Sequence, residues 1–397
     1  MLKNFLPRTV IILGLVSFLN DAASEMITPL LPIFLTATLG AGPAVVGLVE
    51  GVAEAASSLL KLVSGRLTDR GWNAKGLVIG GYSVSNTARP LIGLVFGWPW
   101  VLLLRFLDRV GKGLRTTPRD ALIAASTDSR LRGRAFGFHR ALDHAGAVVG
   151  PLLAFALLSA NVELHNVFLL SVVPGIMVIL LLWFGLPATV DNTTPTAPSV
   201  SFNWRSLDAR LRALIVATGG LALATTPEVF LVLWAQAHGL KVVWVPLLWA
   251  AASAVKVVVA MPGGHWSDRY GRLPVLLIGW SMRVLTLIAL GLTATSATTI
   301  WVLFLAYAAS LAFTEGAERA LIGDYAPAGG KATAFGLYHM TAGLLALPGA
   351  VLFGALWQWF GESVAFFTAA GLTVLSVMIL LWIVSTKING SPVGKDE

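Results

Sequence analysis

Apolar runs of 18 to 25 residues recur from one end of the 397-residue chain to the other. A helix of about 20 apolar residues crosses the hydrocarbon core of a bilayer, which is about 30 Å thick. The pattern therefore predicts a polytopic membrane protein with twelve spanning helices. We place these helices at 8–38, 44–64, 76–97, 100–125, 135–158, 164–187, 211–237, 242–262, 274–295, 299–325, 334–357 and 363–386.

The polar connections between these spans differ in charge. Connections that follow odd-numbered spans hold one basic residue, Lys241, whereas the termini and the other connections hold sixteen. Basic residues beside membrane spans are enriched on the cytoplasmic side. We therefore expect both termini to be cytoplasmic, in the inner membrane of a bacterium. The net charge of +8 is then a topology signal, and we expect no nucleic-acid partner.

The chain divides into two similar halves. A stretch rich in Pro, Thr, Ser and Asn predicts a cytoplasmic linker at 188–208 between six-helix bundles at 1–187 and 209–397. GRLTDRG from Gly65 and GHWSDRYGR from Gly264 lie 199 residues apart, and RDALIA from Arg119 matches ERALIG from Glu318 at the same offset. This tandem repeat predicts two bundles related by a pseudo-two-fold axis along the membrane normal, with a central cavity.

The composition narrows the possible functions. The chain is 56% hydrophobic and 12% charged. It contains no cysteine, and this excludes disulfides, thiolate metal sites and cysteine nucleophiles. No phosphate loop of the type G-x-x-x-x-G-K-[ST] occurs, so ATP-driven transport is not expected. No nucleophile or metal constellation indicates an enzyme, and we expect no cofactor and no bound metal.

The repeated motif resembles the loop signature of the major facilitator superfamily, roughly G-x-L-x-D-R-x-G-R-K. The first copy fits at Gly65, Leu67, Asp69 and Arg70, and the second fits at Gly264, Asp268, Arg269, Gly271 and Arg272. A G-x-x-x-G-P motif, often seen in helix 5 of antiporters of the superfamily, is matched by Gly146, Gly150 and Pro151. The resemblance covers the whole chain and implies an all-α fold whose central cavity opens alternately to each side.

The fourth span carries seven charged residues within RFLDRVGKGLRTTPRD, residues 105–120. At 100° per residue most of them form one stripe, and a charge in a membrane must face protein or a water-filled cavity. Near the middle of the span, Arg105, Arg109 and Lys112 are candidates to bind an anionic substrate group, because a guanidinium binds carboxylate or phosphate through two hydrogen bonds. The alternative is permanent pairing with acids of helices 1 and 2.

The first span carries Asp21 and Glu25, four residues apart on one face. Burial makes a carboxylate easier to protonate, and a nearby arginine has the opposite effect, so a conformational change can alter its protonation. We therefore predict that Asp21, and secondarily Glu25, carries the coupled proton. The alternative is a fixed salt bridge to helix 4.

Helices 2 and 5 supply further candidates for substrate binding, which are Glu50, Glu54, Arg140, Asp143 and His144. A histidine can relay protons near neutral pH. His139 lies closer to the inner surface, where we expect it to be solvated. A divalent-cation site made by His139, Asp143, His144 and helix-1 acids is less favoured, because many basic residues lie beside it.

The resemblance also implies a gate at the cytoplasmic end, where an acid ending helix 4 joins the loop signature. The predicted gate residues are Gly65, Asp69, Arg70, Arg115, Arg119 and Asp120 in the first half, and Asp268, Arg269, Glu318 and Arg319 in the second. Anchoring of helix ends is the alternative for these charges. The second half holds fewer charges, so we expect it to supply an apolar wall, from Phe230, Trp234, Trp249, Tyr307 and Tyr338.

These observations predict a secondary transporter, driven by the proton gradient, that moves a small anionic or amphiphilic organic solute by alternating access. The antiporter motif favours efflux, and we expect a monomer. The alternatives are a uniporter or importer of an organic acid or metal chelate, and a non-transporting membrane sensor.

Overall fold

A computed structural model describes residues 6–128, 131–186, 209–224, 226–292, 296–325 and 331–388. The linker predicted at 188–208 lies outside the described residues. Within the described ranges the regular structure is helical throughout.

The first half contains the six predicted spans. Their elements are α1 (Arg8–Ile27), α2 (Leu31–Ile33), η1 (Phe34–Thr38), α3 (Pro43–Asp69), α4 (Ala74–Leu91), η2 (Ile92–Leu94), α5 (Trp98–Ala125), α6 (Arg132–Ser159), α7 (Leu164–Leu170) and α8 (Val172–Gly185). The six spans are here called helix 1 (α1, α2 and η1), helix 2 (α3), helix 3 (α4 and η2), helix 4 (α5), helix 5 (α6) and helix 6 (α7 and α8). The third span ends at Leu94 rather than at 97, because the chain becomes extended at Val95 before Pro99 begins the next helix.

The second half repeats this order. Its elements are α9 (Ala209–Leu223), α10 (Glu228–Ala237), η5 (Val242–Trp244), α11 (Val245–Tyr270), α12 (Arg272–Gly291), α13 (Ala297–Tyr325), α14 (Lys331–Phe360) and α15 (Glu362–Ile388). Helix 7 is made of α9 and α10. In both halves the second helix, α3 or α11, extends beyond the predicted span into the GRLTD or GHWSD motif.

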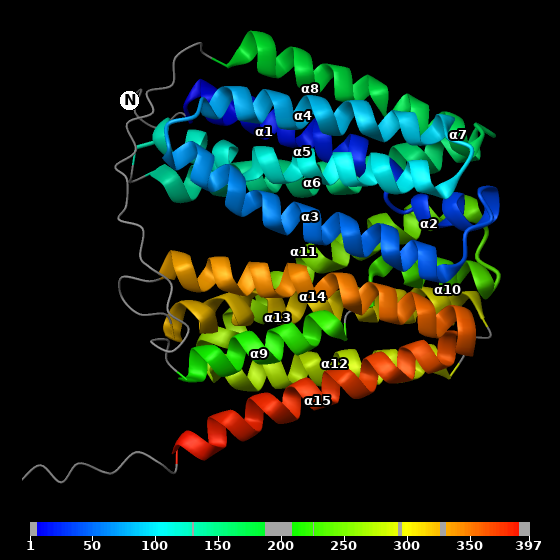
Figure 1. The fold of residues 1–397 in the computed structure, drawn as a ribbon, viewed down its shortest axis with the longest axis vertical. Coiled ribbons are helices and arrows are strands. Elements are labelled where there is room, and N and C mark those ends of the chain that lie inside the picture. The colour runs from blue at the N-terminus through cyan, green and yellow to red at the C-terminus, as the bar shows by residue number, and fades with distance from the viewer. Residues whose placement is uncertain are drawn as a thin grey trace, which may run out of the picture.

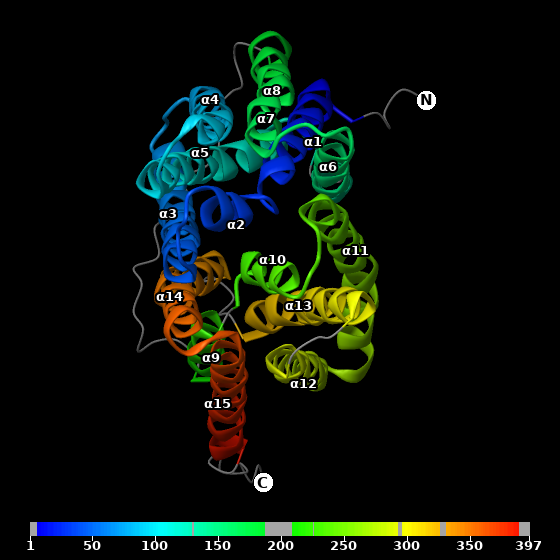
Figure 2. The ribbon, with the colours of Figure 1, turned by 90° about the vertical axis from the view of Figure 1, so that its right-hand side faces the viewer.

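The first helix of each half is broken. Helix 1 is interrupted between Ile27 and Leu31 and helix 7 between Leu223 and Glu228, and each break contains a proline, Pro29 or Pro227. Proline lacks the N–H that a continuing helix needs. The outer pieces, α2 and α10, pack against each other between the two halves (Figure 2).

The long helices of both halves run side by side, with the first half above the second in Figure 1. The halves meet along two helix pairs, α3 with α14 and α6 with α11. Gly47 and Gly51 of α3 lie directly against the backbone of α14, at Ala350 and Leu347, so these glycines allow the two helices to pack closely. Helix α1 begins and α15 ends at the same end of the molecule (left in Figure 1).

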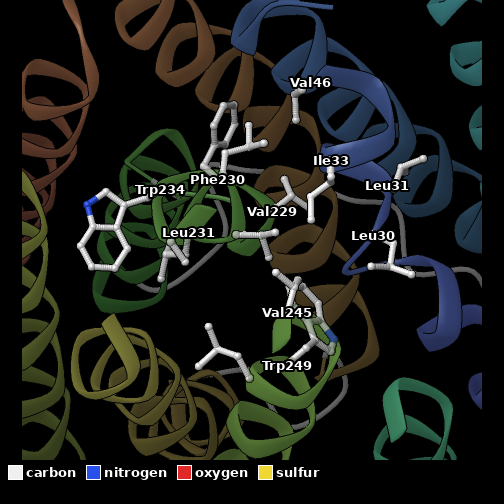
Figure 3. Packing of buried hydrophobic residues seen from close by; sticks show 14 of the residues in the cluster. Leu30, Leu31, Ile33, Val46, Val229, Phe230, Leu231, Trp234, Val245 and Trp249 are labelled. Atoms are coloured by element: carbon white, nitrogen blue, oxygen red, sulfur yellow. The ribbon is translucent and has the colours of Figure 1, made fainter. Parts of the chain in front are cut away.

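One apolar cluster joins the two halves at the opposite end. It includes Leu30, Leu31 and Val46 from the first half and Phe230 and Val245 from the second (Figure 3). Two further clusters lie nearer the other end, and each stays within one half. The interface is therefore sealed by apolar packing at the end that holds α2, α7 and α10.

Ten helical stretches within the described residues are long and apolar enough to cross a membrane. The helices α4 and α5 are not among them, since α4 carries polar residues such as Lys75, Asn86 and Arg89 and α5 carries the charged stripe. Both nevertheless pack within the first bundle, and the molecule has the helical content of a multi-pass membrane protein.

Candidate functional site

A cavity of about 720 Å³ lies between the halves, where α6 faces α11. At its inner wall, Glu25 of α1 accepts a hydrogen bond of 2.8 Å from Trp249 Nε1 of α11. This bond joins the two halves next to the apolar cluster, which contains Trp249. The lining residues are Glu25, Gly137, Arg140, Ala141, His144, Ala147, Glu228, Trp249, Ser253, Lys256, Val257, Ala260, Met261 and Glu315.

A smaller cavity of about 340 Å³ adjoins the first within the second half, and Lys256 and Glu315 line both. Its remaining lining residues are Thr218, Leu221, Ala222, Trp280, Arg283, Ser310, Leu311, Ala312, Thr314, Glu318, Tyr338 and Ala342. Four of the residues that line one or both cavities are carboxylates, three are arginine or lysine, and one is a histidine. Ionisable groups of both signs therefore face the space between the bundles.

The carboxylates of helix 1 have no ionic partner. Neither Asp21 nor Glu25 has a basic nitrogen within 4 Å among the described residues, and Asp21 accepts only a 3.0 Å bond from Asn20 Nδ2. The alternative of a fixed salt bridge from these acids to helix 4 is therefore wrong for this conformation.

Arg105 instead belongs to a buried ion cluster between helices 2, 3 and 4. Asp108 accepts from Arg89 Nε at 2.8 Å and from Arg105 Nη1 at 3.4 Å, and Arg105 also donates to Glu50 at 3.2 Å. The side chain of Asp108 is 0% exposed. Two predicted substrate residues, Arg105 and Glu50, thus bind each other, so the alternative of permanent pairing describes them better.

The other two bases of the stripe differ. Arg109 lies 3.8 Å from Asp108 and is only partly exposed. Lys112 has no ion pair within 4 Å, and its ammonium group has no hydrogen-bond partner in the described part of the chain. Neither base contacts Asp21 or Glu25, and neither lines the two cavities.

Helix 5 places two of its candidates in the larger cavity. Arg140 and His144 line it, while Asp143 accepts from Ser17 Oγ at 2.5 Å and pairs with Arg140 at 3.4 Å. His139 is buried with no partner for Nε2, so the expectation that it is solvated is wrong. Glu54 of helix 2 is exposed and accepts a 3.4 Å bond from Ser58.

Among the described side chains of the predicted first-half gate, Asp120 and Arg70 do not pair in this conformation. Asp120 pairs with the adjacent Arg119 at 2.9 Å rather than with Arg70, which is exposed. The side chain of Asp69 lies outside the described residues. Arg115 is buried against helix 3, where it donates to Ser85 Oγ at 2.6 Å and lies over the Tyr82 ring. Arg115 therefore stabilises its own bundle.

Within this half, Gly65 packs on Thr117 of α5. This contact brings the end of α3 that carries the GRLTD motif close to helix 4. The gate prediction places Gly65 at this same end.

The second half divides its gate candidates between two places. Asp268 pairs with Arg272, which also bonds to Asp324 at 3.3 Å, and Arg269 lies over the ring of Tyr270. Glu318 instead lines the smaller cavity, and Arg319 pairs with Glu315 at 2.5 Å. In this conformation Glu318 is therefore a cavity residue rather than a gate residue, because its carboxylate lines the smaller cavity of the second bundle.

The helix-5 motif packs α6 against helix 1. Gly146 and Gly150 lie against the backbone carbonyls of Phe18 and Ala22, where a Cβ atom would collide, and Pro151 follows inside the helix. The glycines therefore bring α6 close to Asp21.

The chain matches the family model of the Major Facilitator Superfamily over residues 13–259 and 245–396. An uncharacterised transporter of this type from Methanocaldococcus jannaschii is 31% identical over 388 residues, which cover 95% of each chain. The chain belongs to the major facilitator superfamily. It is a transporter-family protein and not an enzyme.

Other superfamily members are more distant. The multidrug resistance protein MdtH of Aeromonas hydrophila is 25% identical over 346 residues, which are 87% of this chain and 86% of that protein. A bacterial homologue of the human lysosomal transporter Spinster, solved in an inward-facing and occupied conformation, superposes with a TM-score of 0.80 at 17% identity, covering 97% and 98% of the two chains. This likeness shows that the fold is that of the superfamily.

Several polar residues of these two cavities were given no role from the sequence. The pair of Glu228 and Lys256, at 2.6 Å, and the donor Trp280 all come from the second half. That half is therefore not an apolar wall, since Tyr338 and Trp280 both donate to Glu318 at 3.1 Å, while Phe230 and Trp234 are buried in the apolar cluster. The sequence signal that could have identified them is a single charged residue within an apolar span, because such a charge needs a partner inside the membrane.

Arg89 was also missed as the central partner of Asp108. Arg89 is a single base within the apolar third span, so the same sequence signal pointed to it. The divalent-cation site considered on helix 5 is not assembled either, because no group of three or more His, Asp or Glu side chains in the described residues could hold a metal ion.

Proposed function

We propose that this protein is a proton-coupled secondary transporter of a small anionic or amphiphilic organic solute, which it moves across the cytoplasmic membrane by alternating access. The observation that supports this most directly is the cavity between the bundles. It is lined by ionisable residues of both halves and sealed at one end by apolar packing. A solute in it would contact both halves, so its binding would depend on their relative position.

Asp21 and Glu25 are the proton carriers in this proposal. Neither pairs with a base in the part of the chain that the structure describes, and Glu25 accepts the Trp249 bond that spans the interface. A hydrogen bond to an ionised carboxylate is roughly twice as strong as a neutral one. Protonation of Glu25 would therefore weaken a contact between the halves, and this links proton binding to rocking of the bundles.

The direction we propose is efflux, with protons moving inward. The relation to the multidrug resistance protein MdtH and the helix-5 glycines supports this direction. We further propose that the end of the molecule at which α1 begins and α15 ends, here called the linker end, is cytoplasmic. When this end closes, Asp69, Arg70 and Asp120 come together in this proposal. Charge reversal at Asp120 would then slow cycling while solute binding is kept.

Proteoliposomes with an imposed pH gradient test the function. A solute panel is first selected by thermal stabilisation of the purified protein, and the selected solutes are then followed in the vesicles. The wild type is expected to accumulate solute against its gradient, and Asp21→Asn is expected to lose this while retaining solute exchange at equal concentrations. Unchanged accumulation by both Asp21→Asn and Glu25→Gln would contradict proton coupling through helix 1 and favour a uniporter.

A further inference from the structure

Arg283 of α12 is a buried arginine without a carboxylate partner. Its residue exposure is 6%, it lines the smaller cavity, and no carboxylate oxygen lies within 4 Å of its guanidinium among the described residues. Burying an unpaired charge is costly, so buried bases are normally paired with acids.

The contacts that Arg283 makes do not neutralise its charge. One Nη group donates to the carbonyl of Ala224 at 3.2 Å, at the break in helix 7. Its Nε is buried with no hydrogen-bond partner, and the guanidinium carbon lies 6.0 Å from the centre of the Tyr307 ring. The group is thus held in place by a neutral acceptor and an aromatic ring, with hydrogen-bonding capacity unused.

The other charges around the smaller cavity already have partners. Lys256 pairs with Glu228 at 2.6 Å, and Glu315 pairs with Arg319. Glu318 does not pair with Arg283, since its two oxygens accept from the neutral donors Trp280 and Tyr338. Arg283 therefore remains the base of this pocket that no acid in the described residues compensates.

The first half shows the compensated version of this arrangement. Arg89 also enters its bundle from the third helix and donates to a helix-1 carbonyl, that of Asn20, at 3.2 Å. It reaches Asp108 of the fourth helix at 2.8 Å. Tyr307 follows Asp108 by 199 residues, which is the repeat offset. In the second half, a tyrosine thus occupies the repeat position of the acid.

We propose that Arg283 binds the anionic group of the transported solute, a carboxylate or a phosphate, in the smaller cavity. The guanidinium supplies the charge and free N–H donors, and Leu221, Trp280 and Leu311 offer apolar surface to the rest of the molecule. This inference rests on the proposed function, because it assigns the substrate class of the same cavity. A purely structural role, capping the Ala224 carbonyl, is the competing account.

Benzoate and phenylphosphonate are suitable probes, with benzamide as the uncharged match to benzoate. The full chain is placed in phosphatidylcholine nanodiscs, and thermal unfolding and tryptophan fluorescence are followed as each probe is titrated. We expect both anions, and not benzamide, to raise the unfolding temperature. Arg283→Gln is expected to weaken anion binding at least about tenfold, as for loss of a charged hydrogen-bond partner, and Arg283→Lys less.

Tyr307→Asp gives the sharpest variant, because it installs the acid of the first half while leaving Arg283 present. It is expected to abolish anion stabilisation, whereas Tyr307→Phe is expected to keep it. Arg8→Gln, at an exposed position on α1, is the matched charge control and should bind as the wild type does. If Arg283→Gln does not fold, the two Tyr307 variants decide the question.

The proposal is overturned if the anions raise the unfolding temperature of the wild type, Arg283→Gln and Tyr307→Asp equally. It is also overturned if neither anion raises the unfolding temperature of the wild type. Adding phosphatidylglycerol to the nanodiscs separates the sources of the anion, since a lipid headgroup bound at Arg283 would compete with benzoate. Anion binding through Arg283 without pH-driven transport in proteoliposomes would refute the proposed function alone. Transport that is independent of Arg283 would refute this inference alone.

Discussion

A buried arginine enters the core of each bundle from its third helix, and the two bundles treat it differently. In the first half, Arg89 and Arg105 share the fully buried carboxylate of Asp108, and Glu50 completes the cluster. In the second half, Arg283 has a backbone carbonyl and the ring of Tyr307 as its neighbours. The two arginines lie 194 residues apart and so are not repeat equivalents, but Asp108 and Tyr307 are, and the group at that repeat position changes from an acid to a tyrosine.

This difference separates a structural role from a binding role. A charge that is neutralised within its own bundle holds helices together and is not available to a ligand. A charge that lacks an internal partner and lines a cavity can be neutralised by a solute. Four experiments test how the two halves differ and how they are held together, from the largest expected effect to the smallest.

Asp108→Asn should be the most damaging change. It leaves three arginines of one buried cluster without their shared carboxylate, and breaking such a pair typically costs about 3 to 5 kcal/mol. Thermal unfolding of the purified protein measures the loss. Asp120→Asn is the control, because it removes an ion pair whose acid is 41% exposed and should cost less than about 1 kcal/mol. Similar losses for both variants would mean that the cluster does not carry the stability of the first half.

Arg89→Gln and Arg283→Gln compare the two arginines directly. Loss of Arg89 removes the 2.8 Å partner of a buried carboxylate, whereas loss of Arg283 removes an unpaired charge and one donor to a carbonyl. We expect Arg89→Gln to destabilise the protein by at least about 2 kcal/mol more than Arg283→Gln in the absence of solute. Chemical unfolding of both variants in the same detergent measures the difference in the free energy of unfolding. Equal losses would show that Arg283, like Arg89, is stabilised by a partner within its own bundle.

Gly146→Leu makes the first half resemble the second at another position, since Leu345 follows Gly146 by 199 residues. The new side chain would meet the Phe18 carbonyl and Asp21, so overpacking should cost about 1 to 3 kcal/mol. Unfolding temperature is the measurement. Gly80→Ala, where nothing lies within 4 Å of the added Cβ, is the control and should change it little. A stable Gly146→Leu variant would show that α6 can move away from helix 1.

Trp249→Phe removes the bond that Glu25 makes across the two halves. A charged hydrogen bond contributes about 1.5 to 3 kcal/mol, and part of this should appear as a shift toward the conformation open at the opposite end. The chain has no native cysteine, so spin labels at the exposed positions Trp72 and Tyr270 report the distance between the linker ends of the halves. We expect a larger population of short distances in Trp249→Phe. An unchanged distribution would place the control of rocking elsewhere.

Much of this architecture could be predicted from the chain. The twelve spans, the repeat at 199 residues and the superfamily follow from apolar run length and from two copies of one motif, because both are local patterns. Helical periodicity also showed that the charges of RFLDRVGKGLRTTPRD share one face. Their residence inside the protein was therefore predictable, and Arg105, Arg115 and Arg119 are indeed buried.

The partners of those charges were decided by the tertiary structure. Periodicity gives the face on which Arg105 lies, but not the helix that packs there, and the structure supplies Glu50 and Asp108 instead of Asp21 or Glu25. Close approach of helices at glycines sets which side chains come within ion-pair distance, and this depends on residues far apart in the sequence. For the same reason Glu25 bonds to Trp249, 224 residues away, and Arg283 lines a cavity without pairing with any acid of the described residues.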